Sequence, residues 1–166
     1  SDSMDEPDKL VLLDFGAIRQ FDYELLTIAH GLLKAGYYHD HQAMMNAMTG
    51  YEFFDTMSQK VSSDIANIFL LATEPFSDTA SNPDIPTKVL DDNQRYIWSN
   101  SKLHSRISAA ATTAMQSFEF NLPPKEFMFI SRKFIGAYTF LTVLDAHTDS
   151  DKLVKPFLQH ENKPNF

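Results

Sequence analysis

The chain has 166 residues, of which 43% are hydrophobic and 22% are charged, and its formal net charge is -8. A chain of this length buries roughly 70% of the surface that it exposes when unfolded, so one domain is expected to fold without a disulfide or a metal ion. The sequence contains no cysteine, which excludes disulfide scaffolds, thiol nucleophiles and cysteine-ligated metal centres. Because basic residues are scattered and outnumbered by acidic ones, no nucleic-acid partner is expected.

The N-terminal region contains the one predicted strand. We expect residues 1–8 to be disordered or vector-derived. Lys9 to Leu13 form a short apolar run without helical spacing, which predicts a buried strand that ends at the turn Asp14-Phe15-Gly16. A lone strand leaves its backbone hydrogen-bonding groups unpaired. We therefore expect this strand to fray or to pair with a second copy of the chain as a homodimer.

Apolar residues at helical spacing predict that the rest of the domain is a helical bundle, so the expected fold class is mainly α with one short N-terminal strand. Residues 74–86 predict an exposed loop, residues 87–98 favour a short helix, and residues 160–166 favour a loose tail. The first predicted helix is 22–35 with Gly36 as a left-handed stop, and a shorter one follows between Asp40 and Gly50. A third runs through Met57 and Ala72 and stops at Pro75, and a fourth is capped by Ser101 and reaches Phe118. The longest runs from Leu122-Pro123-Pro124 to Leu144, and the last lies at 150–159.

The longest predicted helix has the strongest apolar register. Gly136 lies in its middle and costs about 1 kcal/mol relative to Ala, which predicts a close backbone contact at that position. In the last helix, the apolar side chains expected to pack inward are Leu153, Val154, Phe157 and Leu158. The inward face of the longest helix is expected to hold Phe127, Ile130, Phe134, Tyr138, Leu141 and Leu144.

One short string points to chemistry. Asp14, Phe15 and Gly16 follow the predicted strand directly. In kinase-type phosphoryl transfer, an Asp at the end of such a strand binds the magnesium ion that bridges the ATP phosphates, the Phe packs beneath the site and the Gly allows the turn. A carboxylate fixed at a strand terminus suits Mg²⁺, which favours a few rigid oxygen ligands. The alternative is an ordinary strand-to-helix turn in a non-catalytic, all-helical interaction or regulatory module.

The string belongs to a longer pattern, which consists of Leu12-Leu13-Asp14-Phe15-Gly16-Ala17-Ile18-Arg19, then Gly31-Leu32-Leu33-Lys34-Ala35-Gly36, and near the end Leu122-Pro123-Pro124-Lys125-Glu126 and Arg132-Lys133-Phe134-Ile135-Gly136. This order resembles the segment downstream of the metal-binding motif in the UbiB/ADCK (aarF-domain-containing) family of atypical protein-kinase-like proteins. The resemblance covers residues 9–145, and its strong motifs stand at the two ends of that range.

The resemblance implies that residues 9–159 are most of the C-lobe of a kinase-like fold, in an ATP-dependent kinase-like enzyme or ATPase linked to ubiquinone biosynthesis. It implies Mg²⁺ and ATP as cofactors, with Asp14 as the metal ligand and Phe15, Gly16 and Arg19 at the nucleotide site; a surface ion pair is the alternative role of Arg19. The implied partners are ATP and a quinone-related lipid or ubiquinone-biosynthesis proteins. No apolar run is long enough to span a bilayer, so the chain as given is expected to be soluble. The resemblance implies a location in the bacterial cytoplasm, in association with a membrane, or in mitochondria.

The sequence departs from the kinase pattern in ways that set further expectations. It contains no Gly-rich nucleotide loop, no strand Lys with a helix Glu partner, and no catalytic Asp with a downstream Asn, so no catalytic residue is assigned in this fragment. These parts are expected upstream of Asp14. The chain alone is therefore expected to bind Mg-ATP weakly or not at all. Millimolar or tighter binding detected by calorimetry would contradict this expectation. No Ala-Pro-Glu follows Gly16, so the segment that docks peptide substrates in ordinary kinases is absent from the sequence given.

The remaining histidine, arginine and methionine side chains are expected to have structural roles. His39-Asp40-His41 favours a helix cap over a metal site, because imidazoles two residues apart at a helix start point to different sides. Arg132 is expected to form a structural ion pair with an acidic residue, and His104 has no spacing that pairs it with another histidine. The methionines expected to fill the core, rather than form an adaptable binding surface, are Met44, Met45, Met48 and Met57.

Overall fold

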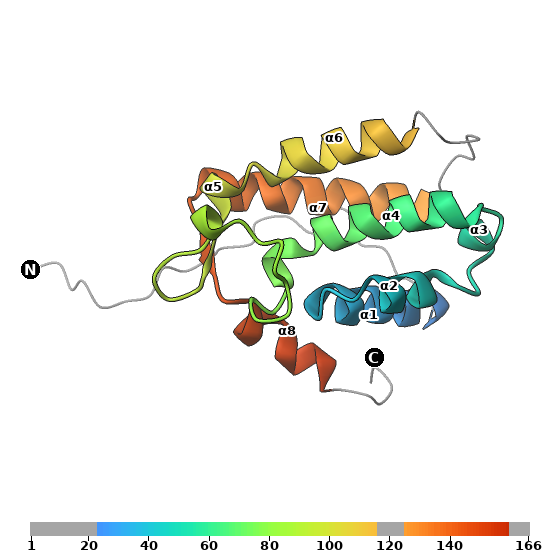
Figure 1. Ribbon diagram of the computed structural model, residues 1–166, viewed down its shortest axis with the longest axis horizontal. Helices are drawn as coiled ribbons and strands as arrows, with labels where there is room; N and C mark the ends of the chain where they lie inside the picture. Colours follow the sequence, from blue (N-terminus) through green and yellow to red (C-terminus); the bar gives the residue numbers. More distant parts are fainter. Residues whose placement is uncertain (1–22, 116–124, 160–166) are drawn as a thin grey trace, which may run out of the picture.

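The computed structural model describes residues 23–115 and 125–159, which are mainly helical, as the sequence predicts (Figure 1). The strand predicted at 9–13, the homodimer contact expected from it and the tail at 160–166 lie outside these residues. The elements in chain order are α1 (Tyr23–Tyr37), α2 (His41–Met48), α3 (Glu52–Asp55), α4 (Gln59–Ala72), the 3-10 turns η1 (Glu74–Phe76) and η2 (Thr87–Val89), β1 (Tyr96–Ile97), α5 (Trp98–Ser101), α6 (Leu103–Met115), α7 (Lys125–Val143), β2 (His147–Thr148) and α8 (Ser150–Leu158).

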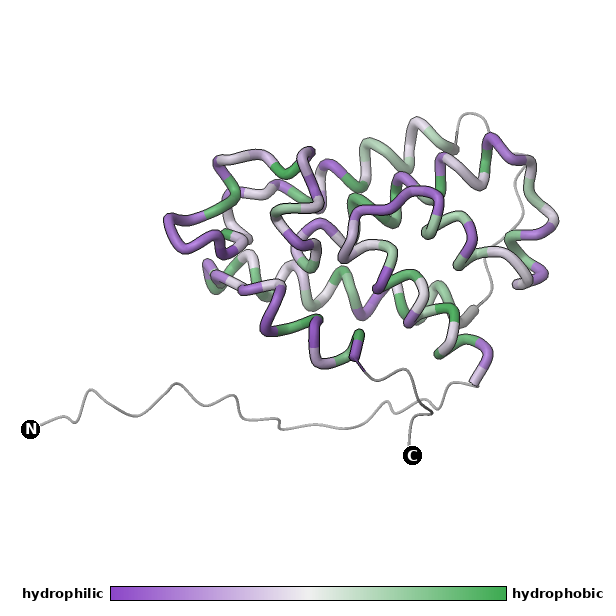
Figure 2. The backbone as a smooth tube through the Cα atoms, turned by 60° about the horizontal axis from the view of Figure 1, so that its bottom comes forward, coloured by the Kyte–Doolittle hydropathy of each residue, from purple (hydrophilic) through white to green (hydrophobic). Residues whose placement is uncertain are grey.

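The helices form one bundle. Helix α2 packs against both α1 and α4, and α4 packs against α6 on its other side. Figure 1 shows α6 at one side of the bundle, α1 and α2 at the opposite side, and α4 and α7 between them. Helix α8 lies across the end of α1 and also contacts η1. In Figure 2 apolar segments recur along the helices, while the connecting loops are mostly hydrophilic.

Side-chain caps begin three of the described helices, and the cap at Asp40 is where the sequence predicts it. The Asp40 carboxylate accepts a hydrogen bond from the Ala43 N–H at 2.9 Å, and the Ser58 hydroxyl oxygen accepts one from the Val61 N–H at 3.4 Å. Asp149 caps α8 in the same way. Each cap satisfies an N–H that the first turn of a helix leaves without a backbone partner.

The predicted role of Gly36 as a left-handed stop is wrong. Helix α1 continues through Gly36 to Tyr37, and His39 adopts the left-handed conformation instead, with a φ of 50°. A Cβ atom on Gly36 would lie 2.3 Å from the Thr73 hydroxyl oxygen, so this position lets α1 approach the end of α4. By contrast, no described atom lies within 4 Å of the Cβ position on Gly136, so the close contact predicted there is also wrong.

Two hydrophobic clusters form the core. The first lies among α1, α2, α3 and α4, and Phe127 of α7 packs against it. The predicted core role of the methionines is confirmed, because Met44 and Met48 are fully buried in this cluster and Met45 and Met57 pack against it. The second cluster surrounds the indole of Trp98 and consists of Val89, Tyr96, Trp98, Leu103 and Tyr138.

Residues 87–98 are not the single short helix that the sequence favours. They form η2, then strand β1, and then the start of α5 at Trp98. Strand β1 pairs antiparallel with β2, with Tyr96 opposite Thr148 and Ile97 opposite His147. The Trp98 indole N–H donates a hydrogen bond to the Thr148 hydroxyl oxygen at 3.0 Å, which fixes the end of this small sheet. Strands of two residues are too short to show the alternation that marks a strand in a sequence.

Helices α7 and α8 expose apolar side chains that the sequence places inward. Phe134 of α7 is 49% exposed, Leu144 just after α7 is 60% exposed, and Phe157 of α8 is 65% exposed. Leu153 is also exposed, whereas Val154 and Tyr138 are buried as predicted. Among the described residues, no helix is both long and apolar enough to cross a membrane.

Candidate functional site

The four residues predicted at the nucleotide site, Asp14, Phe15, Gly16 and Arg19, lie outside the described residues. Helix α1 begins at Tyr23, so residues 17–22 separate Gly16 from the first described helix. Within residues 23–115 and 125–159, no three His, Asp or Glu side chains come together as a metal site. Chemistry in the described part of the chain therefore has to be sought in its cavity and its buried polar groups.

The polar side chains around the start of α2 have separate structural partners. Asp40 is the helix cap that the sequence predicts. The Nε2 atom of His39 lies 3.3 Å from an Asp84 carboxylate oxygen, whereas the Nε2 atom of His41 lies 3.2 Å from the Ser63 hydroxyl oxygen. The two imidazoles therefore bind different segments and do not converge.

Arg132 does not behave as the sequence predicts. Its side chain on α7 is exposed, and it forms no ion pair with any residue that the structure describes. The buried ion pair of the bundle uses a different arginine. Arg106 of α6 donates two hydrogen bonds to the Glu74 carboxylate, at 2.7 and 2.5 Å, and this contact raises the pKa of the Arg106 guanidinium.

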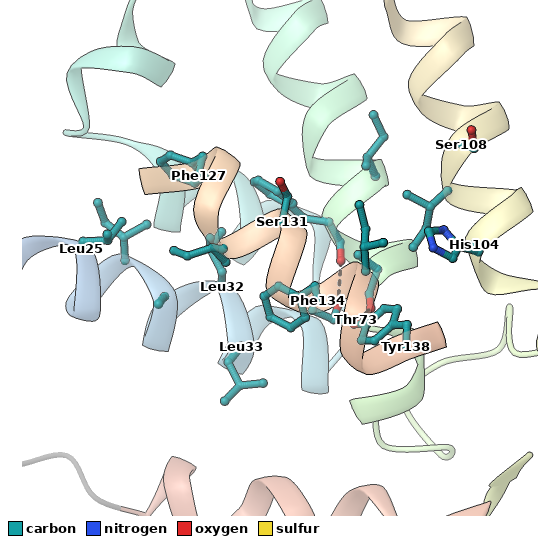
Figure 3. Close-up of a pocket in the computed structure, with 18 residues that line it drawn as sticks. Leu25, Leu32, Leu33, Thr73, His104, Ser108, Phe127, Ser131, Phe134 and Tyr138 are labelled. Atoms are coloured by element: carbon teal, nitrogen blue, oxygen red, sulfur yellow. Dashed lines mark hydrogen bonds between the residues drawn. The ribbon is translucent and has the colours of Figure 1, made fainter. Parts of the chain in front are cut away.

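A cavity of about 430 Å³ lies among α1, α4, α6 and α7 (Figure 3). The described residues that line it are largely aliphatic and aromatic, and none of them is Asp, Glu, Lys or Arg. Helix α1 contributes Leu25, Leu32 and Leu33, and α7 contributes Phe127, Phe134 and Tyr138. In Figure 3, α7 passes over the cavity between α1 on one side and α6 on the other. Ligand sites are commonly concave and apolar with a few polar groups, so this cavity is a candidate binding site.

Most polar atoms of the cavity are already paired within the bundle. The Tyr138 hydroxyl donates to the Ala72 carbonyl at 2.5 Å, and burial raises the pKa of Tyr138. The Thr73 hydroxyl donates to the Phe69 carbonyl at 2.8 Å. The Ser131 hydroxyl donates to the Met128 carbonyl at 3.0 Å. These hydroxyls therefore fix the backbone of α4 and α7 rather than face a ligand.

Two polar side chains at the cavity remain unpaired. His104 and Ser108 lie one turn apart on α6, and neither side chain makes a hydrogen bond with a residue that the structure describes. Figure 3 shows both on the α6 side of the cavity, opposite Leu25 and Leu33. Residues four apart share one face of a helix, so both can serve one ligand.

A buried network holds α6, and with it His104 and Ser108, in place. Glu74 is 4% exposed and accepts hydrogen bonds from Arg106 and from the Tyr96 hydroxyl, the latter at 2.7 Å. Burial and the neighbouring Glu74 carboxylate raise the pKa of Tyr96. A buried charge that is paired and hydrogen-bonded on both oxygens avoids the penalty of an unpaired one. The network joins η1, β1 and α6 across the end of the bundle.

Sequence reasoning missed the cavity and its polar edge. The spacing of Phe127, Ile130 and Phe134 marks an apolar face on α7 but cannot say whether a core or an open cavity lies against it. No sequence motif links His104 with Ser108. The available signal is the presence of His104, Ile107 and Ser108 on one face of the predicted helix, which mixes polar and apolar side chains.

No protein-family model, curated protein or solved structure matches this chain significantly.

Proposed function

We propose that this chain is the C-terminal, helical portion of a UbiB-type atypical kinase-like protein that acts in ubiquinone biosynthesis. The observation that carries the proposal is the string from Leu10 to Arg19, in which a predicted strand ends in Asp14-Phe15-Gly16. The mainly helical structure of the residues downstream supports it, because a kinase-like C-lobe is also mainly helical. A region built mainly of β-strands would have contradicted the proposal.

In the proposed site, each residue of the string has one task. The Asp14 carboxylate would hold Mg²⁺, and the ion, when bound with ATP, neutralises charge on the phosphates. Phe15 would pack beneath the site and Gly16 would permit the turn. Arg19 would supply a positive charge to a phosphate. The remaining phosphate-binding and catalytic groups belong to a segment upstream of Asp14, and a quinone-related lipid or a ubiquinone-biosynthesis protein is the proposed further partner.

The substrate class proposed is a small molecule or water rather than a protein. In protein kinases an activation segment that ends in Ala-Pro-Glu lies between the Asp-Phe-Gly motif and the next helices and positions peptide substrates. Here α1 begins at Tyr23, and residues 17–22 are all that can occupy this position. This spacing supports an ATPase or a small-molecule kinase.

The test uses the native polypeptide that contains this sequence. An antibody against residues 23–115 first establishes its size by immunoblot, and a band much heavier than the chain itself is expected. We then expect Asp14→Asn in that protein to lower Mg-dependent ATP turnover by about 100-fold or more, because a metal ligand supplies several kcal/mol of transition-state stabilisation. Thermal stability without nucleotide should change little.

Asp92→Asn is the matched control. Asp92 is exposed in the loop before β1 and makes no hydrogen bond or ion pair with a described residue, so this variant should turn over ATP as the unmodified protein does. Equal turnover by the Asp14 variant and the control would contradict the proposal. A native band at the size of the chain itself would favour the non-catalytic helical module instead, since no complete nucleotide site would then exist.

A further inference from the structure

We propose that the cavity among α1, α4, α6 and α7 binds an uncharged, single-chain amphiphile, with its hydrocarbon chain in the cavity and its hydrogen-bonding head at His104 and Ser108. This inference concerns the described bundle alone and does not depend on Asp14 or on ATP.

The size of the cavity is the first argument. The cavity is partly open to solvent, because lining side chains such as His104, Ser108 and Phe134 are exposed. The cavity here measures about 430 Å³, which is within the range of small-molecule sites. It is bounded by side chains from four helices, and its walls offer water few partners. A hydrocarbon chain that lies against these walls removes apolar surface from water, which favours binding.

The distribution of polarity is the second argument, and it sets the orientation of the ligand. The α1 side is lined by Leu25, Ile28 and Leu32, which offer only van der Waals contacts. The α6 side carries His104 and Ser108, whose side chains have no hydrogen-bonding partner among the described residues. Figure 3 shows these two sides of the cavity, and a molecule with an apolar chain and one polar end would match both at once.

The absence of charge from the described lining selects the head group. A carboxylate or phosphate head transferred from water requires a cation or several N–H donors to offset its desolvation. No Lys or Arg lines the described cavity, and the hydroxyls of Thr73, Ser131 and Tyr138 already donate to backbone carbonyls. A hydroxyl head, by contrast, needs one donor and one acceptor, which an imidazole and a serine hydroxyl supply.

The partner positions are held in place before any ligand binds. Arg106 lies between His104 and Ser108 in sequence and is fixed by its two hydrogen bonds to the buried Glu74. Ile107, between the same two residues, lines the cavity and packs against the Trp98 cluster. A preorganised helix lowers the conformational cost of binding, because fewer side chains must be ordered by the ligand.

The experiment measures displacement of the uncharged fluorescent probe N-phenyl-1-naphthylamine from the full 166-residue chain. Decanol and decanoate serve as competitors of equal chain length and different head charge. We expect decanol to displace the probe at lower concentration than decanoate. His104→Leu combined with Ser108→Ala should weaken decanol about threefold to tenfold, the effect of losing one or two hydrogen bonds, and leave the probe's own affinity within about twofold.

Two further variants distinguish the contribution of the cavity to binding from that of His104 and Ser108. Ser105→Ala is the matched control on α6, since Ser105 is exposed, as His104 and Ser108 are, but does not line the cavity, and it should change nothing. Ile68→Trp fills the cavity from α4 and should reduce the binding of probe and competitors together; Ala29→Leu on α1 replaces it if the tryptophan variant does not fold.

Three results would overturn the proposal. The first is no saturable probe binding by the unmodified chain. The second is equal competition by decanol and decanoate. The third is an unchanged decanol affinity in the His104 and Ser108 double variant.

Discussion

Asp91 ties the short sheet to the loop before it through four hydrogen bonds. Its carboxylate accepts from the backbone N–H groups of Asn93 and Arg95, each at 2.9 Å, and from the Arg95 Nε–H at 2.8 Å. The Nδ1 atom of His147, on β2, lies 2.9 Å from the same carboxylate. These donors, led by the Arg95 backbone N–H and then His147, hold the pKa of Asp91 well below its ordinary value.

The shifted pKa of Asp91 predicts a pH dependence of stability. A carboxyl whose pKa is lower in the folded state contributes stability that is fully present above its unfolded pKa, here 3.8, and is lost as the pH falls through the folded pKa. We expect Asp91→Asn to be less stable than the unmodified chain at pH 7. The difference should shrink as the pH falls below about 4, because the unfolded chain then binds a proton at Asp91 while the folded chain still holds the charged form. Urea unfolding from pH 7 to pH 2 measures it.

The adjacent Asp92 supplies the control for this measurement. It is exposed and makes no hydrogen bond with a described residue, so Asp92→Asn should leave the shape of the pH profile unchanged. A constant difference between Asp91→Asn and the unmodified chain at all pH values would show that the loss is one of packing, and the assignment of a pH-dependent charge to Asp91 would be wrong.

Two helical glycines, Gly36 near the end of α1 and Gly136 in the middle of α7, contrast at the scale of the helices. Gly36 lies where α1 approaches the end of α4, and an added Cβ would meet the Oγ1, Cβ and Cγ2 atoms of Thr73 within 3 Å. Gly136 lies on an exposed position of α7, and no described atom is within 4 Å of the place where its Cβ would be. The same substitution by Ala therefore tests packing at one position and helix propensity at the other.

We expect Gly36→Ala to destabilise the chain by about 1–3 kcal/mol, because the overlap with Thr73 forces α1 and α4 apart. Gly136→Ala should instead stabilise it by about 0.5–1 kcal/mol, because Ala loses less backbone entropy in a helix than Gly. Urea unfolding monitored by circular dichroism gives both values. Destabilisation by Gly136→Ala would reveal a contact on this face of α7.

Helix positions could be read from the sequence because their signals are local. Asp40 stands beside the helix start that it caps, and the Ser101 hydroxyl accepts a hydrogen bond from the first N–H of α6. Apolar spacing locates α1, α4 and α7 within a few residues. The role of Gly36 could not be read, since the same residue type serves a helix end and a close helix contact. Only the placement of Thr73 against it decides between the two.

Features that depend on several elements at once could not be predicted. The pairing of β1 with β2 joins residues about fifty positions apart, and neither strand carries a periodic pattern of its own. The cavity arises from the spacing of four helices, which periodicity does not determine, so apolar residues such as Phe134 were assigned to a closed core. The residues predicted to bind a nucleotide lie outside the described part of the chain, and their role stays a prediction.

At the scale of the whole molecule, the two hydrophobic clusters share two helices. On α4, Leu70 belongs to the first cluster and Leu71 packs against the second. On α7, the Phe127 ring lies 5.4 Å from that of Phe54 in the first cluster, and the Tyr138 ring lies 4.9 Å from that of Trp98 in the second. Rigid helices that contribute to both clusters should couple them, so that neither unfolds alone.

This coupling predicts how a change in one cluster is sensed in the other. Trp98 is the single tryptophan of the chain and is fully buried in the second cluster, so its fluorescence reports the unfolding of that cluster. Leu70→Ala removes a buried side chain from the first cluster and should cost about 2–5 kcal/mol. If the bundle unfolds as one unit, the urea midpoint from Trp98 fluorescence shifts by the same amount as that from circular dichroism. An unchanged Trp98 midpoint would instead mean that the two clusters unfold independently and that α4 and α7 break between them.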